Sequence, residues 1–255
     1  MKPDLMDKVI IITGAGSGIG RASSLLFAKE GAKIIVANRR EEKGNETVEL
    51  VKDAGGEAFF IQCDVSNEEN VKNLIDKTIK KYGRLDGAFN NAGIVGIRKS
   101  IIELNSKEFD EVIRTNLFGT FLLVKYQVQQ MLKQKSKGSI VNITSVAGLL
   151  GRPGRSPYNS SRSGIIALTR TAAIEYIKNG IRINCLAPGV VKTDLFQTST
   201  DGGKTNKIKE YEDAHPIGRV AEPEEVAESA LWLLSDKSSF VVGHTLVVDG
   251  GYTIL

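Results

Sequence analysis

The stretch KVIIITGAGSGIG, residues 8–20, decides the fold. Its β-branched run predicts a buried strand, and four glycines follow before the helical pattern of residues 21–30, RASSLLFAKE. Glycines let a backbone turn tightly and approach a pyrophosphate closely, while a helix N-terminus offers unpaired N–H groups and the positive end of its dipole. A dinucleotide site is therefore predicted at Gly14, Ser17, Gly18, Ile19 and Gly20, with simple tight packing as the alternative.

Short apolar runs and longer amphipathic stretches continue to alternate along the chain. Six further runs have the composition of strands, at residues 33–38, 57–63, 87–90, 139–144, 181–187 and 245–249. They are near-continuous rather than alternating, which is typical of strands buried on both faces of a parallel sheet. Gly31, Gly83 and Gly180 stand where helices are expected to end. The pattern predicts a doubly wound α/β sheet of about seven strands with helices on both faces.

Composition places the chain among ordinary globular proteins. Its 255 residues are 41% hydrophobic and 25% charged, and one domain spanning residues 1–255 is expected. The 34 basic and 30 acidic residues are spread without a long run of one sign, which gives no support to nucleic-acid or membrane binding. The opening residues are charged and the apolar run after them is short, so we expect a cytoplasmic protein.

The cysteines and histidines show no metal-binding spacing. Cys63 and Cys185 lie in or beside apolar runs, which indicates buried free thiols. His215 and His244 lack neighbouring ligands at a suitable spacing, so structural or surface roles are expected for both. The sequence predicts no metal site.

The end of the second predicted strand, Ala37-Asn38-Arg39-Arg40, bears on the choice of cofactor. An acidic side chain at this point would accept hydrogen bonds from a free ribose 2′-hydroxyl. Asn38 does not repel a 2′-phosphate as a carboxylate would, and Arg39 can bind one through charge-assisted hydrogen bonds. NADP(H) is therefore favoured over NAD(H). The alternative is that both arginines are solvated turn residues and that Asn38 binds a free ribose.

Further motifs follow in register, among them Asn90-Asn91-Ala92-Gly93, Asn116 in RTNLFG, Ser145 in NITSVAG and Tyr158 in SPYNSS. With the loop at residues 13–20, which matches TGxxxGxG, they resemble the short-chain dehydrogenase/reductase family over essentially the whole chain. The resemblance implies a Rossmann-like fold and an NAD(P)(H)-dependent oxidoreductase that interconverts an alcohol and a ketone or aldehyde. It also implies cofactor contacts by Asp64, Val65, Asn91, Ala92, Gly93, Tyr158, Arg162, Pro188, Gly189, Val191 and Thr193.

The catalytic positions that the resemblance implies are Asn116, Ser145 and Tyr158. Hydride transfer to a carbonyl leaves an oxygen that must be protonated, and the reverse reaction needs a base. A tyrosine serves both directions if a nearby cation lowers its pKa from about 10 toward neutrality. Ser145 would hydrogen-bond the substrate oxygen, and Asn116 would support a water path to solvent.

Arg162 departs from the family pattern YxxxK. Tyr158 and Arg162 are four residues apart on a helix introduced by Pro157, so they lie on one face. Arginine keeps the positive charge, and its fork of donors suits the nicotinamide ribose hydroxyls, but it does not release a proton as a lysine can. Three interpretations stay open: an enzyme with an altered proton relay, a dinucleotide-binding protein of little turnover with a sensor or structural role, and an introduced substitution.

The substrate is small and its class is open, because sugar, steroid, fatty-acyl and polyketide alcohols or ketones all agree with the motifs. Residues 192–215 are polar and contain glycines, which predicts a substrate lid within the domain. Arg152 and Arg155 either attract an anionic substrate or simply solvate their loop. The resemblance further implies a homotetramer or homodimer, formed through the helices that carry Asn116 and Tyr158 and through the C-terminal segment.

Overall fold

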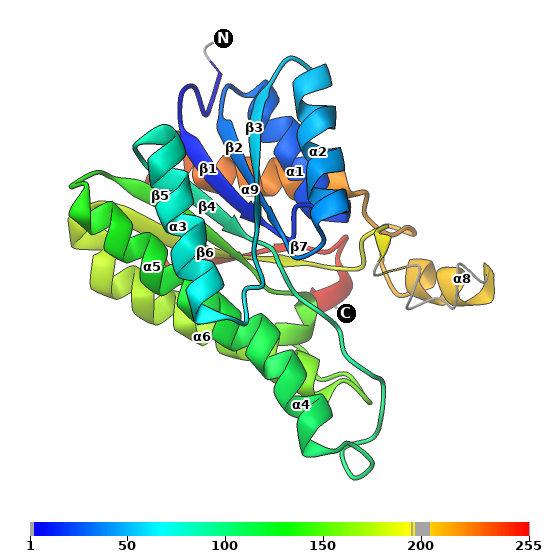
Figure 1. The fold of residues 1–255 in the computed structure, drawn as a ribbon. Helices are drawn as coiled ribbons and strands as arrows, with labels where there is room; N and C mark the ends of the chain where they lie inside the picture. The colour runs from blue at the N-terminus through cyan, green and yellow to red at the C-terminus, as the bar shows by residue number, and fades with distance from the viewer. Residues whose placement is uncertain (1–2, 195, 197–204, 255) are drawn as a thin grey trace.

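In the computed structural model, which describes residues 3–194, 196 and 205–254, seven strands form one sheet in the order β3-β2-β1-β4-β5-β6-β7 (Figure 1). The strands are β1 (Val9–Thr13), β2 (Lys33–Asn38), β3 (Glu57–Gln62), β4 (Gly87–Asn90), β5 (Gly138–Ile143), β6 (Ile181–Pro188) and β7 (Thr245–Val248). All neighbours pair in parallel. The prediction of seven strands is confirmed, and each strand begins and ends within one residue of its predicted bounds.

Burial differs between the centre of the sheet and its edges. Every residue of β1, β4 and β6 is buried, as near-continuous apolar runs predict. The edge strands β3 and β7 carry exposed and half-buried residues, because each has a neighbouring strand on one side only. The expectation of strands buried on both faces is therefore correct for the centre and wrong for the edges.

Helices cover both faces of the sheet, as predicted (Figure 1). One face packs against α1 (Gly18–Lys29), α2 (Glu41–Asp53) and α9 (Pro223–Leu234), and the other against α3 (Glu68–Tyr82), α5 (Gly119–Lys133) and α6 (Ser156–Tyr176). The shorter segments are α4 (Ser106–Val112), α8 (Thr205–Asp213), the π-helical η1 (Ile113–Phe118) and the 3-10 turns η2 (Val146–Gly148), η3 (Ile177–Asn179), η4 (Asp236–Ser238) and η5 (Tyr252–Ile254). No helix in the described ranges has both the length and the apolar character that crossing a membrane requires.

Glycines end helical segments where the sequence predicts. Gly83, with φ +74°, caps α3 and donates its N–H to the carbonyl of Ile79. Gly180, with φ +78°, follows η3. Both residues adopt the left-handed conformation that glycine tolerates without a steric penalty. These turns direct the chain into β4 and β6.

The order of strands places a crevice above the centre of the sheet. Successive strands run outward from β1 in one direction through β2 and β3, and in the other direction from β4 to β7. Ligands of such sheets bind at the carboxyl ends of the strands, where this reversal occurs. Beyond the body of the sheet, α4 and α8 project from the molecule (Figure 1). The topology therefore predicts a site between the loops that follow β1 and β4.

A chain of buried side-chain hydrogen bonds lies beneath that site. Asn90, at the end of β4, donates to Gln127 of α5 at 2.9 Å and to Asn142 of β5 at 2.8 Å. Asn142 in turn donates to Thr169 of α6 at 2.9 Å. All four residues are buried, and a satisfied polar network in a low-dielectric interior specifies one arrangement. The network therefore fixes α6, which carries Tyr158, against the sheet.

Thr13 joins the end of β1 to the loop after β4. Its hydroxyl oxygen accepts the backbone N–H groups of Asn91 at 3.0 Å and Ala92 at 3.1 Å. The side-chain amide of Asn91 donates back to the carbonyl of Thr13 at 3.2 Å and to that of Gly14 at 3.4 Å. The glycine loop and the loop after β4 are thus held next to each other.

Thr13→Val tests this junction, because valine keeps the shape of threonine and removes the acceptor. We expect the free energy of unfolding to fall by about 1–3 kcal/mol, the cost of leaving buried polar groups unsatisfied. Urea denaturation at fixed protein concentration measures the change. Thr171→Val, at an exposed position of α6, is the matched control and should shift stability by no more than about 0.5 kcal/mol. Equal midpoints for the two variants would show that Thr13 contributes nothing specific.

Candidate active site

A cleft of about 440 Å³ opens at the carboxyl ends of the strands, which is within the size range of small-molecule sites. All residues that the sequence predicts for the site line this cleft except Gly20 and Asn116. The described part of the predicted lid also reaches it, through Phe196 and Tyr211, whose rings are 5.7 Å apart. Residues 195 and 197–204 of that lid lie outside the described residues.

The glycine loop presents bare backbone to the cleft. Gly14 and Gly18 have φ angles of +65° and +50°, which favour glycine. A Cβ atom at Gly18 would lie 2.8 Å from Cγ2 of Thr193 and would fill the space between the loop and the opposite wall. Ser17 precedes α1 without a capping side-chain bond to any described residue, so the first N–H groups of the helix remain available to an anion. Gly20 instead packs within the loop, since a Cβ there would lie 2.4 Å from the carbonyl oxygen of Gly14.

One end of the cleft is formed where β2 and β3 finish. The side-chain amide of Asn38 donates to the carbonyl of Arg40 at 2.8 Å. Arg39 and Arg40 are exposed and line the cleft. Asp64 accepts the backbone N–H of Ser66 at 2.9 Å and its hydroxyl at 2.7 Å through the same carboxylate oxygen. This end therefore combines two exposed cations with a carboxylate whose orientation is fixed.

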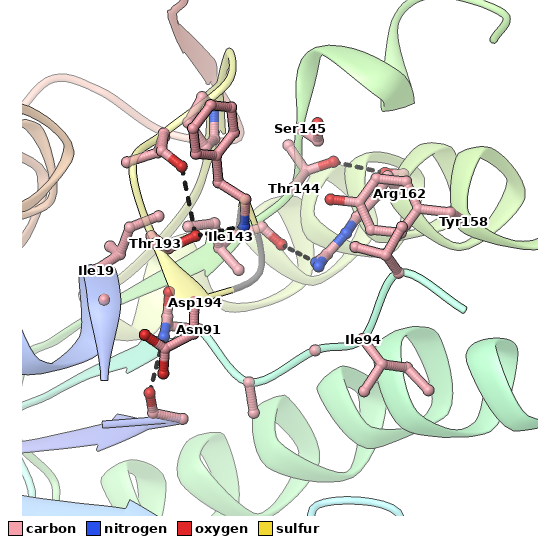
Figure 2. Close-up of a pocket in the computed structure, with 18 of the residues that line it drawn as sticks. Ile19, Asn91, Ile94, Ile143, Thr144, Ser145, Tyr158, Arg162, Thr193 and Asp194 are labelled. Atoms are coloured by element: carbon pink, nitrogen blue, oxygen red, sulfur yellow. Dashed lines mark hydrogen bonds between the residues drawn. The ribbon is translucent and has the colours of Figure 1, made fainter. Parts of the chain in front are cut away.

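Tyr158 and Arg162 meet at the start of α6 (Figure 2). The guanidinium carbon lies 4.9 Å from the centroid of the phenol ring, so the two residues share one face of the helix as their spacing predicts. Arg162 is only 4% exposed, and its Nη1 donates to the carbonyl of Ile143 at 3.0 Å. Its own carbonyl accepts the hydroxyl of Thr144 at 2.8 Å. The end of β5 thus holds the arginine by both its head and its backbone.

Asn116 stands behind the wall of the cleft and fixes the loop after β4. Its Oδ1 accepts the N–H of Ile94 at 2.8 Å, and its Nδ2 donates to the Ile94 carbonyl at 2.9 Å and to Oγ of Ser161 at 3.1 Å. Gly93 separates this amide from Arg162, because a Cβ atom there would lie 2.6 Å from Nη2 of Arg162 and 3.1 Å from Oδ1 of Asn116. The geometry is that of a positioning residue, which acts on the cleft through the backbone of Ile94.

Ser145 follows β5 and faces the same cavity as Tyr158 (Figure 2). Its hydroxyl oxygen accepts the N–H of Ala147 at 3.2 Å, which caps the 3-10 turn η2. That bond uses a lone pair of the oxygen and leaves the hydroxyl proton to donate into the cleft. The strand end thus supplies a fixed hydrogen-bond donor near the phenol.

Comparisons with known proteins identify the family. A sequence profile described as enoyl-(acyl carrier protein) reductase matches residues 14–253. The chain is 44% identical over 253 residues to 2,5-dichloro-2,5-cyclohexadiene-1,4-diol dehydrogenase of Sphingobium indicum, which covers 99% of each chain. The chain belongs to the short-chain dehydrogenase/reductase family.

Two more matches agree with this short-chain dehydrogenase/reductase assignment. Glucose 1-dehydrogenase 2 of Bacillus subtilis is 37% identical over 100% of this chain and 98% of its own length. A crystal structure of levodione reductase matches the fold with a TM-score of 0.95 at 35% identity, covering 98% of this chain and 99% of that one. The family and fold that the motifs implied are confirmed, and the protein is an oxidoreductase.

The cleft of this short-chain dehydrogenase/reductase fits a nicotinamide dinucleotide. Arg162 lines the cleft, and its Nε is buried without a hydrogen-bond partner among the described residues, so the guanidinium keeps donor capacity that the protein does not use. Its N–H groups suit a ribose hydroxyl as acceptor. The bare backbone at Gly18 and the open N-terminus of α1 suit a pyrophosphate. A nicotinamide dinucleotide carries both a ribose and a pyrophosphate, so it would occupy both parts of the cleft.

His215 supports the wall opposite the glycine loop, and sequence reasoning did not find this contact. Its Nε2 accepts the N–H of Val190 at 3.2 Å, and its Nδ1 donates to the carbonyl of Tyr211 at 2.6 Å. The residue is buried, which agrees with the structural role that was expected. No local pattern signals the bond, because 25 residues separate the donor from the acceptor.

The two cysteines are free and buried, as predicted. Burial raises the pKa of the Cys63 thiol to about 12 and that of Cys185 to about 11. Cys63 lines the cleft, and at neutral pH it stays an uncharged thiol with little nucleophilic character. Within the described ranges, no three His, Cys, Asp or Glu side chains are grouped to hold a metal ion.

Gly93→Ala tests whether the position of Arg162 matters to turnover. The added methyl group would meet the guanidinium at 2.6 Å and displace it, while the backbone of Gly93 has no positive φ that would strain alanine. We expect kcat for ketone reduction to fall by about 100-fold, the usual effect of misplacing a catalytic group by about 1 Å. Gly151→Ala, where a Cβ atom meets nothing within 4 Å, is the matched control. Full activity of Gly93→Ala would contradict the assigned role of Arg162.

Proposed function

We propose that this short-chain dehydrogenase/reductase interconverts a small-molecule alcohol and its ketone or aldehyde with NAD(P)(H), and that Tyr158 is the general acid and base. The observation that carries the proposal is the buried guanidinium of Arg162, 4.9 Å from the centroid of the Tyr158 ring in the cleft that the glycine loop also lines. A permanent cation next to a phenol stabilises the negative charge that develops when the phenol gives up its proton.

Each side chain has a role that its contacts support. When bound, the nicotinamide supplies or accepts a hydride. Tyr158 donates a proton to the carbonyl oxygen of the substrate in reduction and removes it from the alcohol in oxidation. Ser145 donates its hydroxyl proton to the same oxygen and holds it near the phenol. Asn116 keeps the loop after β4 in place through Ile94, and the guanidinium of Arg162 binds a ribose hydroxyl.

Arg162 stands where the family has a lysine that can release a proton, and its guanidinium packs against the surrounding residues. Its head bonds to Ile143, lies against Gly93 and covers the Tyr158 ring. We infer that the site is built for arginine, which supplies charge and orientation, and that protons leave Tyr158 by a route that does not ionise residue 162. This arrangement supports a working enzyme over a protein that only binds the dinucleotide.

Arg162→Lys and Tyr158→Phe test the proposed function together. Phenylalanine removes the proton donor and should lower kcat by about 10²–10⁴-fold while NADPH still binds. Lysine loses the bond to Ile143 and the contact over the ring, so we expect kcat to fall by about 10-fold. NADPH oxidation with a panel of ketones gives kcat, and fluorescence titration gives cofactor affinity. Unchanged turnover in Tyr158→Phe contradicts the role of Tyr158, and faster turnover in Arg162→Lys contradicts the fit of arginine.

We propose NADP(H) as the preferred cofactor. Arg39 and Arg40 line the cleft beyond Asn38, and neither guanidinium is paired with a carboxylate among the described residues. Two unpaired arginines suit the 2′-phosphate of NADP(H), which a carboxylate at the end of β2 would repel.

Arg39→Gln tests this preference. The loss of one charged contact to the phosphate should raise KM for NADPH by about 10–100-fold, because a hydrogen bond between charged groups contributes about 1.5–3 kcal/mol. KM for NADH should stay within about twofold. Arg170→Gln, an exposed arginine on α6, is the matched control for net charge. A wild-type enzyme that prefers NADH would contradict the proposal before any variant is compared.

The remaining expectations concern organisation and location. We propose that residues 1–255 act as one unit, with residues 192–215 as the substrate lid, since Phe196 and Tyr211 line the cleft. A homotetramer or homodimer is supported by exposed apolar side chains on the predicted surfaces, among them Phe121 of α5, Ile174 of α6 and Phe240 before β7. The cytoplasmic location stays a prediction of the sequence.

A further inference from the structure

The substrate end of the cleft carries two arginines on one tight turn. In Arg152-Pro153-Gly154-Arg155 the N–H of Arg155 donates to the carbonyl of Arg152 at 3.3 Å, and Gly154 has φ +74°. Proline in the second position and a left-handed glycine in the third are typical of a type II β-turn, whose end residues are within about 7 Å of each other. The turn lies between Ser145 and Tyr158 in the sequence, and both arginines line the cleft that these two residues also line.

Arg155 is half-buried and lines the cleft. Its Nη1 donates to the carbonyl of Gly96 at 3.2 Å. Burial lowers the pKa of its guanidinium, and the nearby charges of Arg98 and Arg152 act in the same direction, while the phenols of Tyr211 and Tyr158 oppose them. The charged and phenolic groups that act most strongly on Arg155 are thus Tyr211, Arg98, Tyr158 and Arg152.

Arg152 is anchored next to it by a tyrosine near the end of the chain. Its Nη2 donates to the hydroxyl of Tyr252, and its guanidinium carbon lies 4.7 Å from the centroid of that ring. The Tyr252 ring is 5.0 Å from the ring of His215, which supports the wall at Val190. The position of Arg152 is therefore set by the same wall that encloses the cleft.

Neither arginine has a counter-ion in the described part of the chain. By contrast Lys99, whose N–H donates to the carbonyl of Gly154 in the same turn, pairs with Glu108 at 2.6 Å. Two positive charges that are partly withdrawn from water and unpaired are unfavourable by themselves. Arginines that only solvate a loop would extend into water, whereas both of these line the cleft and are bonded to the protein, Arg155 to Gly96 and Arg152 to Tyr252.

We propose that Arg152 and Arg155 bind a carboxylate of the substrate, so that the enzyme acts on keto acids and hydroxy acids in which the reacting carbon and the carboxylate are separate groups. The inference rests on the proposed function, because it places the carbonyl at Tyr158 and Ser145 and the carboxylate at the turn. Each guanidinium has one nitrogen committed to the protein, and the remaining N–H groups match an anion with two oxygens. The two arginines determine specificity and take no part in proton transfer.

A pair of ketones that differ only in charge tests the proposal. We would measure NADPH-dependent reduction of 3-oxocyclohexane-1-carboxylate and of 3-oxocyclohexane-1-carboxamide by the full-length enzyme. kcat/KM should be about 10–100-fold higher for the acid, as expected for charged hydrogen bonds. Arg155→Gln and Arg152→Gln should each lower kcat/KM for the acid by about 10-fold or more, mainly through KM, and should lower kcat/KM for the amide by a much smaller factor.

Controls separate recognition of the carboxylate from a structural role of the turn. Arg155→Lys keeps the charge and should recover part of the activity on the acid. Arg114 is an exposed arginine of η1, and Arg114→Gln should leave kcat/KM unchanged for both the acid and the amide. Higher salt should weaken binding of the acid and not of the amide. Equal losses for acid and amide in Arg155→Gln, or equal kcat/KM values for the two ketones in the wild type, would overturn the proposal.

Binding measurements keep this inference distinct from the proposed function. Isothermal titration of the acid and the amide into the enzyme saturated with NADP⁺ reports affinity without turnover. If the acid binds more tightly than the amide and Arg155→Gln removes the difference, the carboxylate site is supported. That result is independent of turnover, so it would hold even if Tyr158→Phe were as active as the wild type and the proposed function were wrong. If the enzyme reduces neutral ketones and binds acid and amide equally, the carboxylate site is wrong and the proposed function stands.

Discussion

The loop that follows β4 is held from two directions, and the active-site cleft depends on this constraint. On one side the hydroxyl of Thr13 accepts the N–H groups of Asn91 and Ala92. On the other, the amide of Asn116 pairs with both backbone groups of Ile94. Between these two anchors the chain has little freedom, because its polar backbone groups are already satisfied inside the protein. The loop therefore presents a fixed surface to the cofactor and to Arg162.

The guanidinium of Arg162 lies next to this fixed loop. A Cβ atom at Gly93 would lie 2.6 Å from Nη2, so any side chain there would displace the guanidinium. The carbonyl of Ile143 accepts a hydrogen bond from Nη1, and the guanidinium lies over the ring of Tyr158. A planar guanidinium fits between a flat ring and bare backbone, whereas a compact ammonium would meet fewer partners. Arginine thus fits in place of the lysine of the YxxxK motif, because Gly93 and Tyr158, which match the family motifs, leave room for its guanidinium and pack against it.

Arginines mark three parts of the cleft and differ in what holds them. Arg39 is exposed at the end of β2, where it suits a phosphate. Arg162 is buried at the centre, where it suits a ribose and a phenolate. Arg155 is half-buried and donates to the carbonyl of Gly96. All three arginines line one cleft, so positive charge is spread along it, where it favours anionic groups and developing negative charge.

The sequence by itself determined the sheet, the family and most of the residues that line the cleft. The strands could be predicted because their apolar runs are continuous, and the helix ends because Gly83 and Gly180 adopt the left-handed conformation that only glycine adopts readily. The spacing of Tyr158 and Arg162 placed them on one face, since neighbours on a helix are a local property. Only the tertiary structure decided that Asn116 lies behind the wall, that His215 supports Val190 and that Arg155 bonds to Gly96. Those contacts join residues 22, 25 and 59 positions apart, and side-chain packing between separate elements leaves no periodic signal in the chain.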